Sequence, residues 1–233
     1  MLRFPTAVEL RRRAKAFWAR SMTNRLIVIC AAVYLAQALE IFCDTPFAMN
    51  AILIREGFWL NLLTYAFLHG NFWHLALNAI AFYFIGNAIE RYESGKTVLA
   101  VFLGGSAAGA LCWLGMMETL AAEPFASTLV GASAGIAALF AYFSIDNRSS
   151  EISALLFYVV PVKMRAWVLF AALTAISVFF LFFSEIPSIR DTTSAGGAFT
   201  VGHSAHIGGL LFGAVYALAA ELLRKRNGNV QYF

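Results

Sequence analysis

The sequence has little charge and few cysteines. Charged residues make up 13% of the 233-residue chain, against about 25% in an average soluble domain, and they are clustered, so that long stretches carry none. This scarcity excludes an ordinary soluble domain. The cysteines Cys30, Cys43 and Cys112 are widely spaced and odd in number. They therefore predict neither a metal site nor a disulfide framework, and we expect them to be buried as small apolar side chains.

The sequence is rich in apolar residues. They make up 61% of the chain, and the mean hydropathy is +0.72. The apolar runs approach the ~20 residues of a transmembrane helix, and they do not alternate as the strands of a membrane barrel would. The sequence predicts an all-α polytopic membrane protein. Six transmembrane helices are expected at residues 26–43, 69–90, 97–117, 130–146, 166–184 and 203–223.

The basic residues are unevenly distributed. Residues 1–25 hold seven of the 17 lysines and arginines and one acidic residue. Every second connection after that is richer in these residues than its neighbours, so the positive-inside rule places both termini in the cytoplasm. The net charge of +4 is therefore assigned to topology and to contact with anionic membrane lipids, with no nucleic-acid partner. The expected organisation is a basic cytoplasmic segment, a six-helix membrane domain and a cytoplasmic tail, at residues 1–25, 26–223 and 224–233.

The stretch Gly131-Ala132-Ser133-Ala134-Gly135 fits two unrelated patterns. It fits the G-x-S-x-G elbow that exposes a nucleophilic serine in soluble hydrolases. It also fits the G-x-x-x-G spacing at which two membrane helices touch. The soluble elbow follows a strand, whereas this stretch opens an apolar helix, which argues against an α/β hydrolase. Ser133 is then either a membrane-embedded nucleophile or a small residue at a helix contact.

Polar side chains on three of the expected helices lie at one depth. His74 and Asn78 share a face of the second helix, Ser133 opens the fourth, and His206 lies near the start of the sixth. A rise of 1.5 Å per residue puts all four roughly 18–27 Å from the cytoplasmic helix ends, in the outer half of a ~30 Å core. Polar groups in a membrane are costly and mark functional sites.

This convergence is suited to acyl transfer. A serine needs a base to take its proton, and His206 or His74 could serve. An asparagine amide, a second imidazole and the Ser133 N–H could bind a developing oxyanion. Glycines on both helices would let the sixth approach the fourth closely enough for this contact. They are Gly131 and Gly135 on the fourth helix, and Gly209 and Gly213 on the sixth.

Three motifs, in order, resemble those of the rhomboid intramembrane serine proteases. "HGNFWHLALN", "GASAG" and "AHIGGLLFG" are similar to the family's oxyanion, nucleophile and base motifs, and the resemblance covers roughly residues 50–223. It implies that Ser133 is the nucleophile and His206 the general base of a dyad. His74, Asn78 and the Ser133 amide would bind the oxyanion, with Gly131 as a supporting residue. The family cleaves transmembrane segments of membrane proteins, in a cavity open to the outer side, without metal or cofactor.

Three positions depart from the family pattern. Ala134 follows the serine where glycine is commoner, and this methyl group should be tolerated. Ala137 stands where many members have an aromatic ring against the base histidine, so His206 is either less firmly oriented or held by another ring. The first outer loop lacks a Trp-Arg pair, because Trp59 is followed by Leu60, and its anchoring is expected to differ.

Two other functions remain open. An inactive rhomboid-like protein would bind transmembrane clients without cutting them, and a small transporter would use the histidines as a polar path. The chain has no inverted repeat to favour a transporter. The size fits a protein of the bacterial inner membrane, and an organelle membrane is the alternative location. The sequence names neither the substrate nor the oligomeric state.

Overall fold

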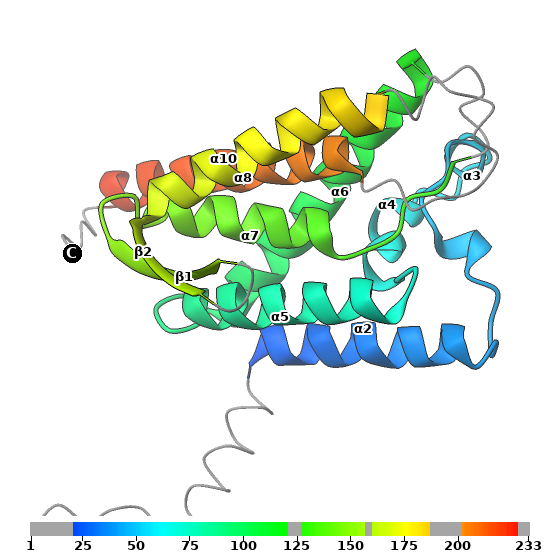
Figure 1. Cartoon of the computed structure of the whole chain (residues 1–233), viewed down its shortest axis with the longest axis horizontal. Coiled ribbons are helices and arrows are strands. Elements are labelled where there is room, and N and C mark those ends of the chain that lie inside the picture. The colour runs from blue at the N-terminus through cyan, green and yellow to red at the C-terminus, as the bar shows by residue number, and fades with distance from the viewer. Residues whose placement is uncertain (1–20, 121–126, 157–159, 187–201, 228–233) are drawn as a thin grey trace, which may run out of the picture.

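The computed structural model describes residues 21–120, 127–156, 160–186 and 202–227. Six long helices form a bundle (Figure 1). They are α2 (Met22–Ala38), α5 (Phe72–Ile89), α6 (Gly95–Leu120), α7 (Ser133–Asp146), α8 (Ala166–Phe180) and α10 (His203–Arg226). They overlap the six expected apolar runs, although α2 begins and ends four to five residues before the expected range 26–43. The expected segments 1–25 and 224–233 lie largely outside the described residues.

Four of these helices are long and apolar enough to cross a membrane: Phe72–Ile89, Gly95–Leu120, Ala166–Phe183 and His203–Arg226. The protein is thus predominantly helical, with several candidate spans. The helices α2 and α7, of 17 and 14 residues, are apolar but shorter. At 1.5 Å per residue α7 extends about 21 Å, less than a ~30 Å core. The expected count of six complete spans is therefore not established.

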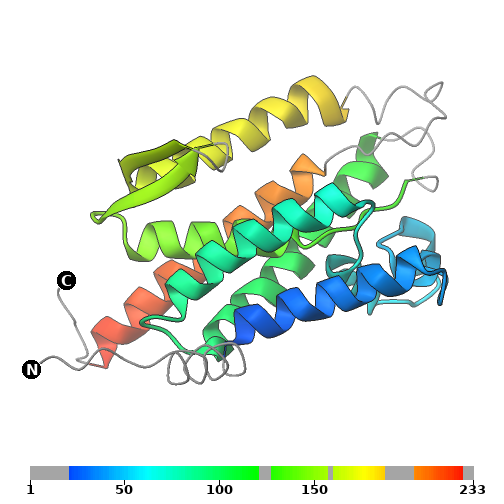
Figure 2. The same cartoon turned by 60° about the horizontal axis from the view of Figure 1, so that its bottom comes forward.

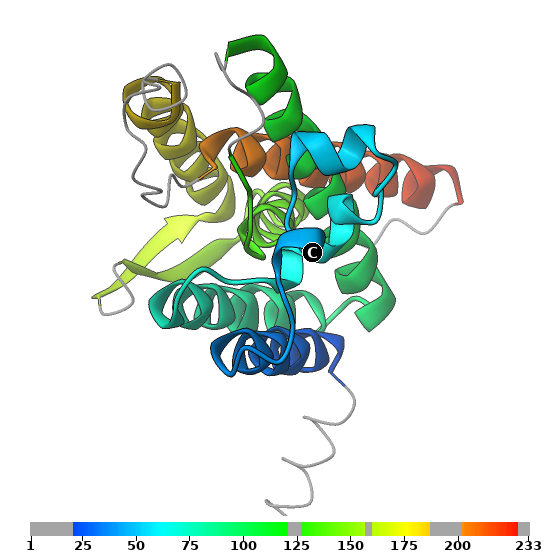
Figure 3. The same ribbon diagram turned by 90° about the vertical axis from the view of Figure 1, so that its right-hand side faces the viewer.

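The helix α7 lies at the centre of the bundle. Figure 3, which looks along the bundle, shows α5, α6, α8 and α10 around it. Most α7 side chains are buried, including Leu139, Tyr142 and Ser144. A helix enclosed in this way can be short because other helices, rather than lipid, surround its ends.

Close approach of α10 to α7 depends on glycine. A Cβ added at Gly209 would overlap the carbonyl oxygen of Ala134, and one at Gly213 would overlap that of Ala138. Backbones can come this near only where side chains are missing. The sequence therefore predicted the two α10 glycines correctly as contact residues, but the α7 residues that they touch are alanines.

The expected α7 partners, Gly131 and Gly135, face other neighbours. A Cβ at Gly135 would lie 2.5 Å from the Phe102 ring and 2.6 Å from the Ser106 hydroxyl, both on α6. One at Gly131 would lie 2.6 Å from the ring of His74 on α5. An added Cβ at Gly131 or Gly135 would thus point toward α5 or α6 rather than α10, because Gly131 lies in the turn before α7 and Gly135 is 100° around the helix from Ala134.

A two-stranded antiparallel hairpin joins α7 to α8, so the all-α description was incomplete. Strand β1 (Glu151–Leu156) pairs with β2 (Val160–Arg165), with Glu151 opposite Arg165 and Leu156 opposite Val160. Valines alternate with other residues in β2, and β-branched side chains favour strands. Figure 2 shows the hairpin and α8 at one edge of the bundle, with α2 at the opposite edge.

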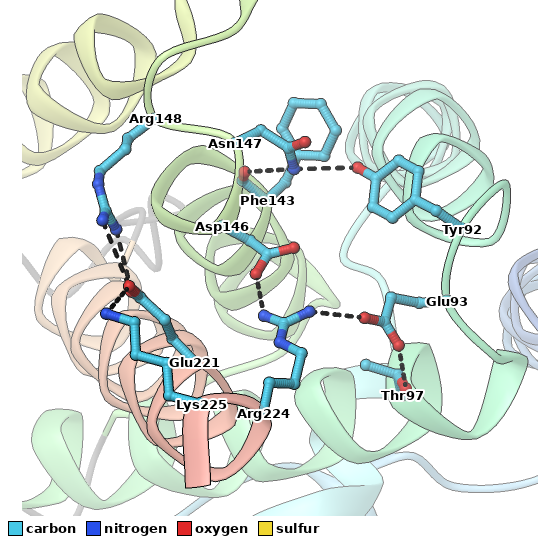
Figure 4. Close-up of polar contacts among 10 residues, drawn as sticks. All are labelled: Tyr92, Glu93, Thr97, Phe143, Asp146, Asn147, Arg148, Glu221, Arg224 and Lys225. Atoms are coloured by element: carbon cyan, nitrogen blue, oxygen red, sulfur yellow. Dashed lines mark hydrogen bonds and ion pairs between the residues drawn. The ribbon is translucent and has the colours of Figure 1, made fainter. Parts of the chain in front are cut away.

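Ion pairs fasten the bundle at the end opposite Ser133. The Arg224 guanidinium of α10 bonds to Glu93, in the turn after α5, at 3.2 Å and also pairs with Asp146 at the end of α7. Nearby, Arg148 pairs with Glu221 at 3.0 Å. Figure 4 shows that these contacts tie three segments of the chain together.

The outer connection between α2 and α5 is a compact set of short helices. They are η1 (Thr45–Phe47), α3 (Ala51–Arg55), α4 (Asn61–Thr64) and η2 (Tyr65–Phe67). Despite the missing Trp-Arg pair, this connection is anchored. The Asn61 side chain donates to the Ala48 carbonyl at 2.9 Å, and Arg55 pairs with Glu118 of α6. Trp59 is 61% exposed.

Candidate active site

Ser133 and His206 form a direct hydrogen bond between α7 and α10. The distance from Ser133 Oγ to His206 Nε2 is 2.8 Å, although the residues are 73 positions apart in the chain. Both side chains are half-buried. His206 lies in the first turn of α10, where its N–H donates to the Gly202 carbonyl at 3.1 Å. A hydroxyl at this distance from an imidazole nitrogen can pass it a proton.

The backbone before Ser133 turns sharply and starts α7 at the serine itself. Gly131 has a φ of +121°, a left-handed conformation that favours glycine, and its N–H donates to the Tyr65 carbonyl at 3.0 Å. The helix therefore begins at Ser133, three residues later than expected. The first N–H groups of a helix have no intrahelical acceptor and lie at the positive end of its dipole. The Ser133 amide can thus donate to an anionic oxygen.

His74 lies beside this turn. An Asn71 side chain caps the start of α5 and accepts the His74 N–H at 2.8 Å. The His74 ring packs on Gly131, where an added Cβ would lie 2.7 Å from Nε2. The structure therefore brings His74 to the segment that carries Ser133, as the sequence predicted.

Asn78 follows one turn later on the same face of α5. Its side-chain Nδ2 donates to the His74 carbonyl at 3.0 Å, which uses one of the two N–H groups of the amide. The second N–H remains to be offered to another acceptor. Asn78 is thus held in orientation by its own helix.

His69 supports His74 from the connection before α5. Its ring lies edge-on to that of His74, with 5.2 Å between the ring centroids, and it is 2% exposed. Its backbone N–H donates to the Gln37 side chain of α2 at 3.1 Å. His69 therefore belongs to the packing around the site.

A ring does contact His206, and it comes from His203. The His203 and His206 centroids are 5.5 Å apart with an interplanar angle of 86°. Ala137, on α7, offers only a methyl group. The missing ring at position 137 thus does not leave His206 without an aromatic neighbour.

Residues of the outer connection hold the turn before Ser133, and they were not predicted as part of the site. Met49 and Leu129 exchange two backbone hydrogen bonds, of 3.0 and 2.9 Å. Buried Tyr65, whose carbonyl binds Gly131, donates its hydroxyl to the Ser106 carbonyl at 2.7 Å. These contacts depend on long-range pairing, and no local motif signals them.

Metal-ligating side chains do not cluster within the part of the chain that the structure describes. Over the described ranges no group of three or more His, Cys, Asp or Glu side chains is placed to hold a metal ion. Cys30 is buried and Cys112 half-buried, but Cys43 is exposed. The expectation of a buried thiol was wrong for Cys43 because α2 ends at Ala38, which leaves this residue in a surface loop.

The chain is similar in sequence to known proteins of the rhomboid family. A family model described as the rhomboid domain matches residues 56–221. The chain is 27% identical to "Rhomboid protein 1, mitochondrial" of Saccharomyces cerevisiae over 72% of its own length and 44% of that protein's. It is 29% identical to "Putative rhomboid protease YdcA" of Bacillus subtilis, over 46% and 51% of the two chains.

A third relative is "Rhomboid protease GluP" of Bacillus subtilis, 33% identical over 41% of this chain and 18% of the relative. The alignments thus span about half or less of the length of these relatives. The family model nevertheless covers most of the chain, including every polar residue of the site. With its several apolar helices, the chain is an integral multi-pass membrane protein, and it belongs to the rhomboid family, whose members include named proteases.

Proposed function

We propose that this protein is an intramembrane serine endopeptidase that cleaves transmembrane segments of membrane proteins. Ser133 is the nucleophile and His206 the general base. The observation that carries this proposal is the 2.8 Å hydrogen bond from Ser133 Oγ to His206 Nε2. Family membership supports the activity, because two of the relatives are named as rhomboid proteases.

Acylation follows from the order of these atoms. Ser133 Oγ attacks the carbonyl carbon of the scissile peptide while His206 Nε2 takes the hydroxyl proton, so a C–O bond forms and the carbonyl oxygen becomes an anion. When the tetrahedral intermediate collapses, the C–N bond breaks and His206 gives its proton to the leaving nitrogen. The amine product departs and the acyl group remains on Ser133.

The developing oxyanion would be bound on the side of Gly131. The Ser133 N–H lies at the start of α7, where the helix dipole favours negative charge. The His74 ring packs on Gly131. The Asn78 amide has a second N–H that can donate to the oxyanion. Removing one such donor in serine hydrolases costs about 10²–10³ in kcat. These three groups form the proposed oxyanion hole.

Deacylation uses the same pair. Water attacks the ester carbon, His206 Nε2 takes its proton, and Ser133 leaves with that proton restored. Both products are then free, and neither step requires a metal or a cofactor. Water must therefore reach Ser133, which is half-buried rather than sealed in the bundle.

The distribution of charge supports one topology. We propose that residues 1–25 and 224–233 lie in the cytoplasm, that residues 26–223 form the membrane domain, and that Ser133 faces the outer half of the bilayer. The Arg224 network would then lie at the cytoplasmic ends of the helices, where basic residues are favoured. The bacterial inner membrane is the proposed location.

The test is cleavage of a single-span substrate, with a small residue near its outer end, in liposomes. Wild type, Ser133→Ala and His206→Ala are compared by gel electrophoresis at matched reconstitution. We expect cleavage by wild type only, because each variant removes one member of the dyad. A serine-reactive fluorophosphonate should label wild type and leave Ser133→Ala unlabelled.

The second candidate is a rhomboid-like protein that binds transmembrane clients without cutting them. Ala137 favours it, because this position gives His206 no ring from α7. Folded wild type that is neither labelled by the phosphonate nor active on several substrates would support this second function and contradict the first.

A further inference from the structure

A carboxylate on the segment after α8 binds the first turn of α10. The π-helical turn η3 (Leu181–Glu185) follows α8 directly. Glu185 Oε2 accepts the Ser204 backbone N–H at 2.7 Å, and the Ser204 hydroxyl donates to Oε1 at 2.5 Å. Glu185 is 2% exposed. A buried carboxylate needs such donors, because a charge without partners is costly inside a protein.

Glu185 replaces the usual N-cap of α10. The residue at the N-cap position is Gly202, which has no side chain to accept an N–H. A carboxylate near the start of a helix binds free N–H groups and interacts favourably with the helix dipole. The direction of the first turn of α10, which carries His206, is thus fixed by a residue from another segment.

A chain of rings runs from α8 to the same turn. The Phe180 ring stacks on that of His203, with 5.2 Å between centroids and an interplanar angle of 18°. The His203 ring in turn lies edge-on to His206, at 5.5 Å. Ring pairs with these geometries stabilise a structure by more than the burial of their apolar surface alone. His206 therefore contacts α8 through one intermediate ring.

The π-helical turn explains how Phe180 and Glu185 both reach α10. Phe180 and Glu185 are five residues apart, which in an α-helix would turn their side chains about 140° away from each other. A π-helix bonds residue i to i+5, so five residues complete little more than one turn. The two side chains then lie on similar sides of the segment, toward α10.

The rest of α8 has few buried side chains. Of its described residues, Ala166 and Ser177 are buried, whereas Phe179 and Ile176 are 53% exposed. Figure 2 shows α8 at the edge of the bundle. The contacts that Phe180 and Glu185 make with α10 are thus among the main contacts that hold the C-terminal end of α8 against the bundle.

We propose that the C-terminal end of α8, together with η3, is a positioning element for His206. Glu185 orients the first turn of α10, and Phe180 fixes the His203 ring, which holds the His206 ring toward Ser133. None of the three touches the reacting atoms, so they are positioning residues. The inference rests on the proposed function, because it assigns a role relative to the general base.

Two measurements test this proposal in proteoliposomes. The first is kcat and KM for the single-span substrate. The second is the rate at which a small fluorophosphonate labels Ser133, because a small probe needs an oriented His206 but no entry of a transmembrane segment. The variants are Glu185→Ala, Glu185→Gln, His203→Ala, His203→Phe and Phe180→Leu. Phe182→Leu is the control, since Phe182 is 60% exposed on the same segment.

We expect Glu185→Ala and His203→Ala to lower both kcat and the labelling rate by roughly 10-fold, with KM little changed, because small misplacements of catalytic groups slow the chemical step. The effect of Phe180→Leu should be in the same direction and smaller. His203→Phe should restore most of the rate because it keeps the ring, and Glu185→Gln should restore part because it keeps one acceptor. Phe182→Leu should match wild type.

The possible outcomes separate this proposal from the proposed function. If wild type is labelled and active but the labelling rate is unchanged in Glu185→Ala and His203→Ala, α8 does not position His206. This holds even if these variants cleave the substrate more slowly, since they would then affect its entry. If wild type itself is neither labelled nor active, the proposed function fails first.

Discussion

Single glycines set the distance between the two helices of the candidate site. Gly209 lies three residues after His206, and its Cα faces the Ala134 carbonyl next to Ser133. A methyl group at this position meets backbone rather than a flexible side chain, so neither helix can yield without moving. The Ser133–His206 contact is therefore sensitive to a change of one carbon atom.

Gly209→Ala should lower the unfolding temperature of the detergent-solubilised protein and reduce cleavage. Overpacking of this kind costs about 1–3 kcal/mol, and the shift would separate Ser133 Oγ from His206 Nε2. Gly115→Ala is the control, because no atom lies within 4 Å of a Cβ at that position of α6. Alanine in an open helix position is expected to be neutral or stabilising. Equal effects of the two substitutions would contradict the close-contact explanation.

At the scale of whole elements, α2 is attached to the bundle through its first turn. Glu90, which ends α5, accepts the Thr23 backbone N–H at 2.7 Å and the Thr23 hydroxyl at 2.9 Å. Gly86 lies against the Thr23 side chain, so the two helices touch where the cap forms. Loss of this carboxylate should free the start of α2 before it affects α7 or α10.

Glu90→Ala should therefore expose Cys30, which lies on α2 and is 3% exposed. The measurement is the rate of maleimide alkylation of Cys30 in detergent, in a background with Cys43→Ser and Cys112→Ser. We expect a faster reaction after Glu90→Ala than in the parent protein. The control is Glu56→Ala, in the outer connection, which should leave the rate unchanged. An unchanged rate after Glu90→Ala would show that the contact between Glu90 and Thr23 is not needed to hold α2.

The elements also show what could be predicted from sequence. The long helices were predicted correctly because uninterrupted apolar runs indicate a membrane helix without reference to other segments. The start of α7 was predicted three residues early, because the left-handed turn at Gly131 depends on a hydrogen bond to Tyr65. The hairpin before α8 was not predicted, since the residues between the fourth and fifth expected helices were expected only to connect them.

The candidate site was predicted to a similar extent. The four polar residues at one depth were recognised from helix spacing alone. The contacts of Phe180 and Glu185 with α10 were not, because they depend on a π-helical turn and on side chains that meet across a long connection. Local sequence patterns do not indicate such long-range side-chain contacts.

At the scale of the whole molecule, the end opposite Ser133 is held by a shared cation. Arg224 binds carboxylates from two other segments, Glu93 and Asp146, and its own side chain is 39% exposed. Removing it would leave two nearby negative charges without a common partner. The network therefore resists separation of α10 from α7 and from the turn after α5.

Arg224→Met should destabilise the protein by about 1–3 kcal/mol, the cost of leaving partly buried acceptors without their donor. Lys225→Met is the matched control, because Lys225 pairs with Glu221 within one helix and is 59% exposed; such pairs contribute about 0.3–0.5 kcal/mol. Unfolding temperatures in detergent at low and high salt compare the two variants. The difference between Arg224→Met and wild type should shrink at high salt, because ions screen exposed charges. A loss no greater than that of Lys225→Met would contradict a bridging role.

The order in which the site residues occur in the chain has a consequence for biosynthesis. The proposed base, His206, follows the proposed nucleophile by 73 residues, on the last helix that the structure describes. While the chain is being synthesised, Ser133 enters the membrane well before His206 leaves the ribosome. A nascent chain would thus hold an unactivated serine, and the proposed proteolytic activity would appear only when α10 docks against α7.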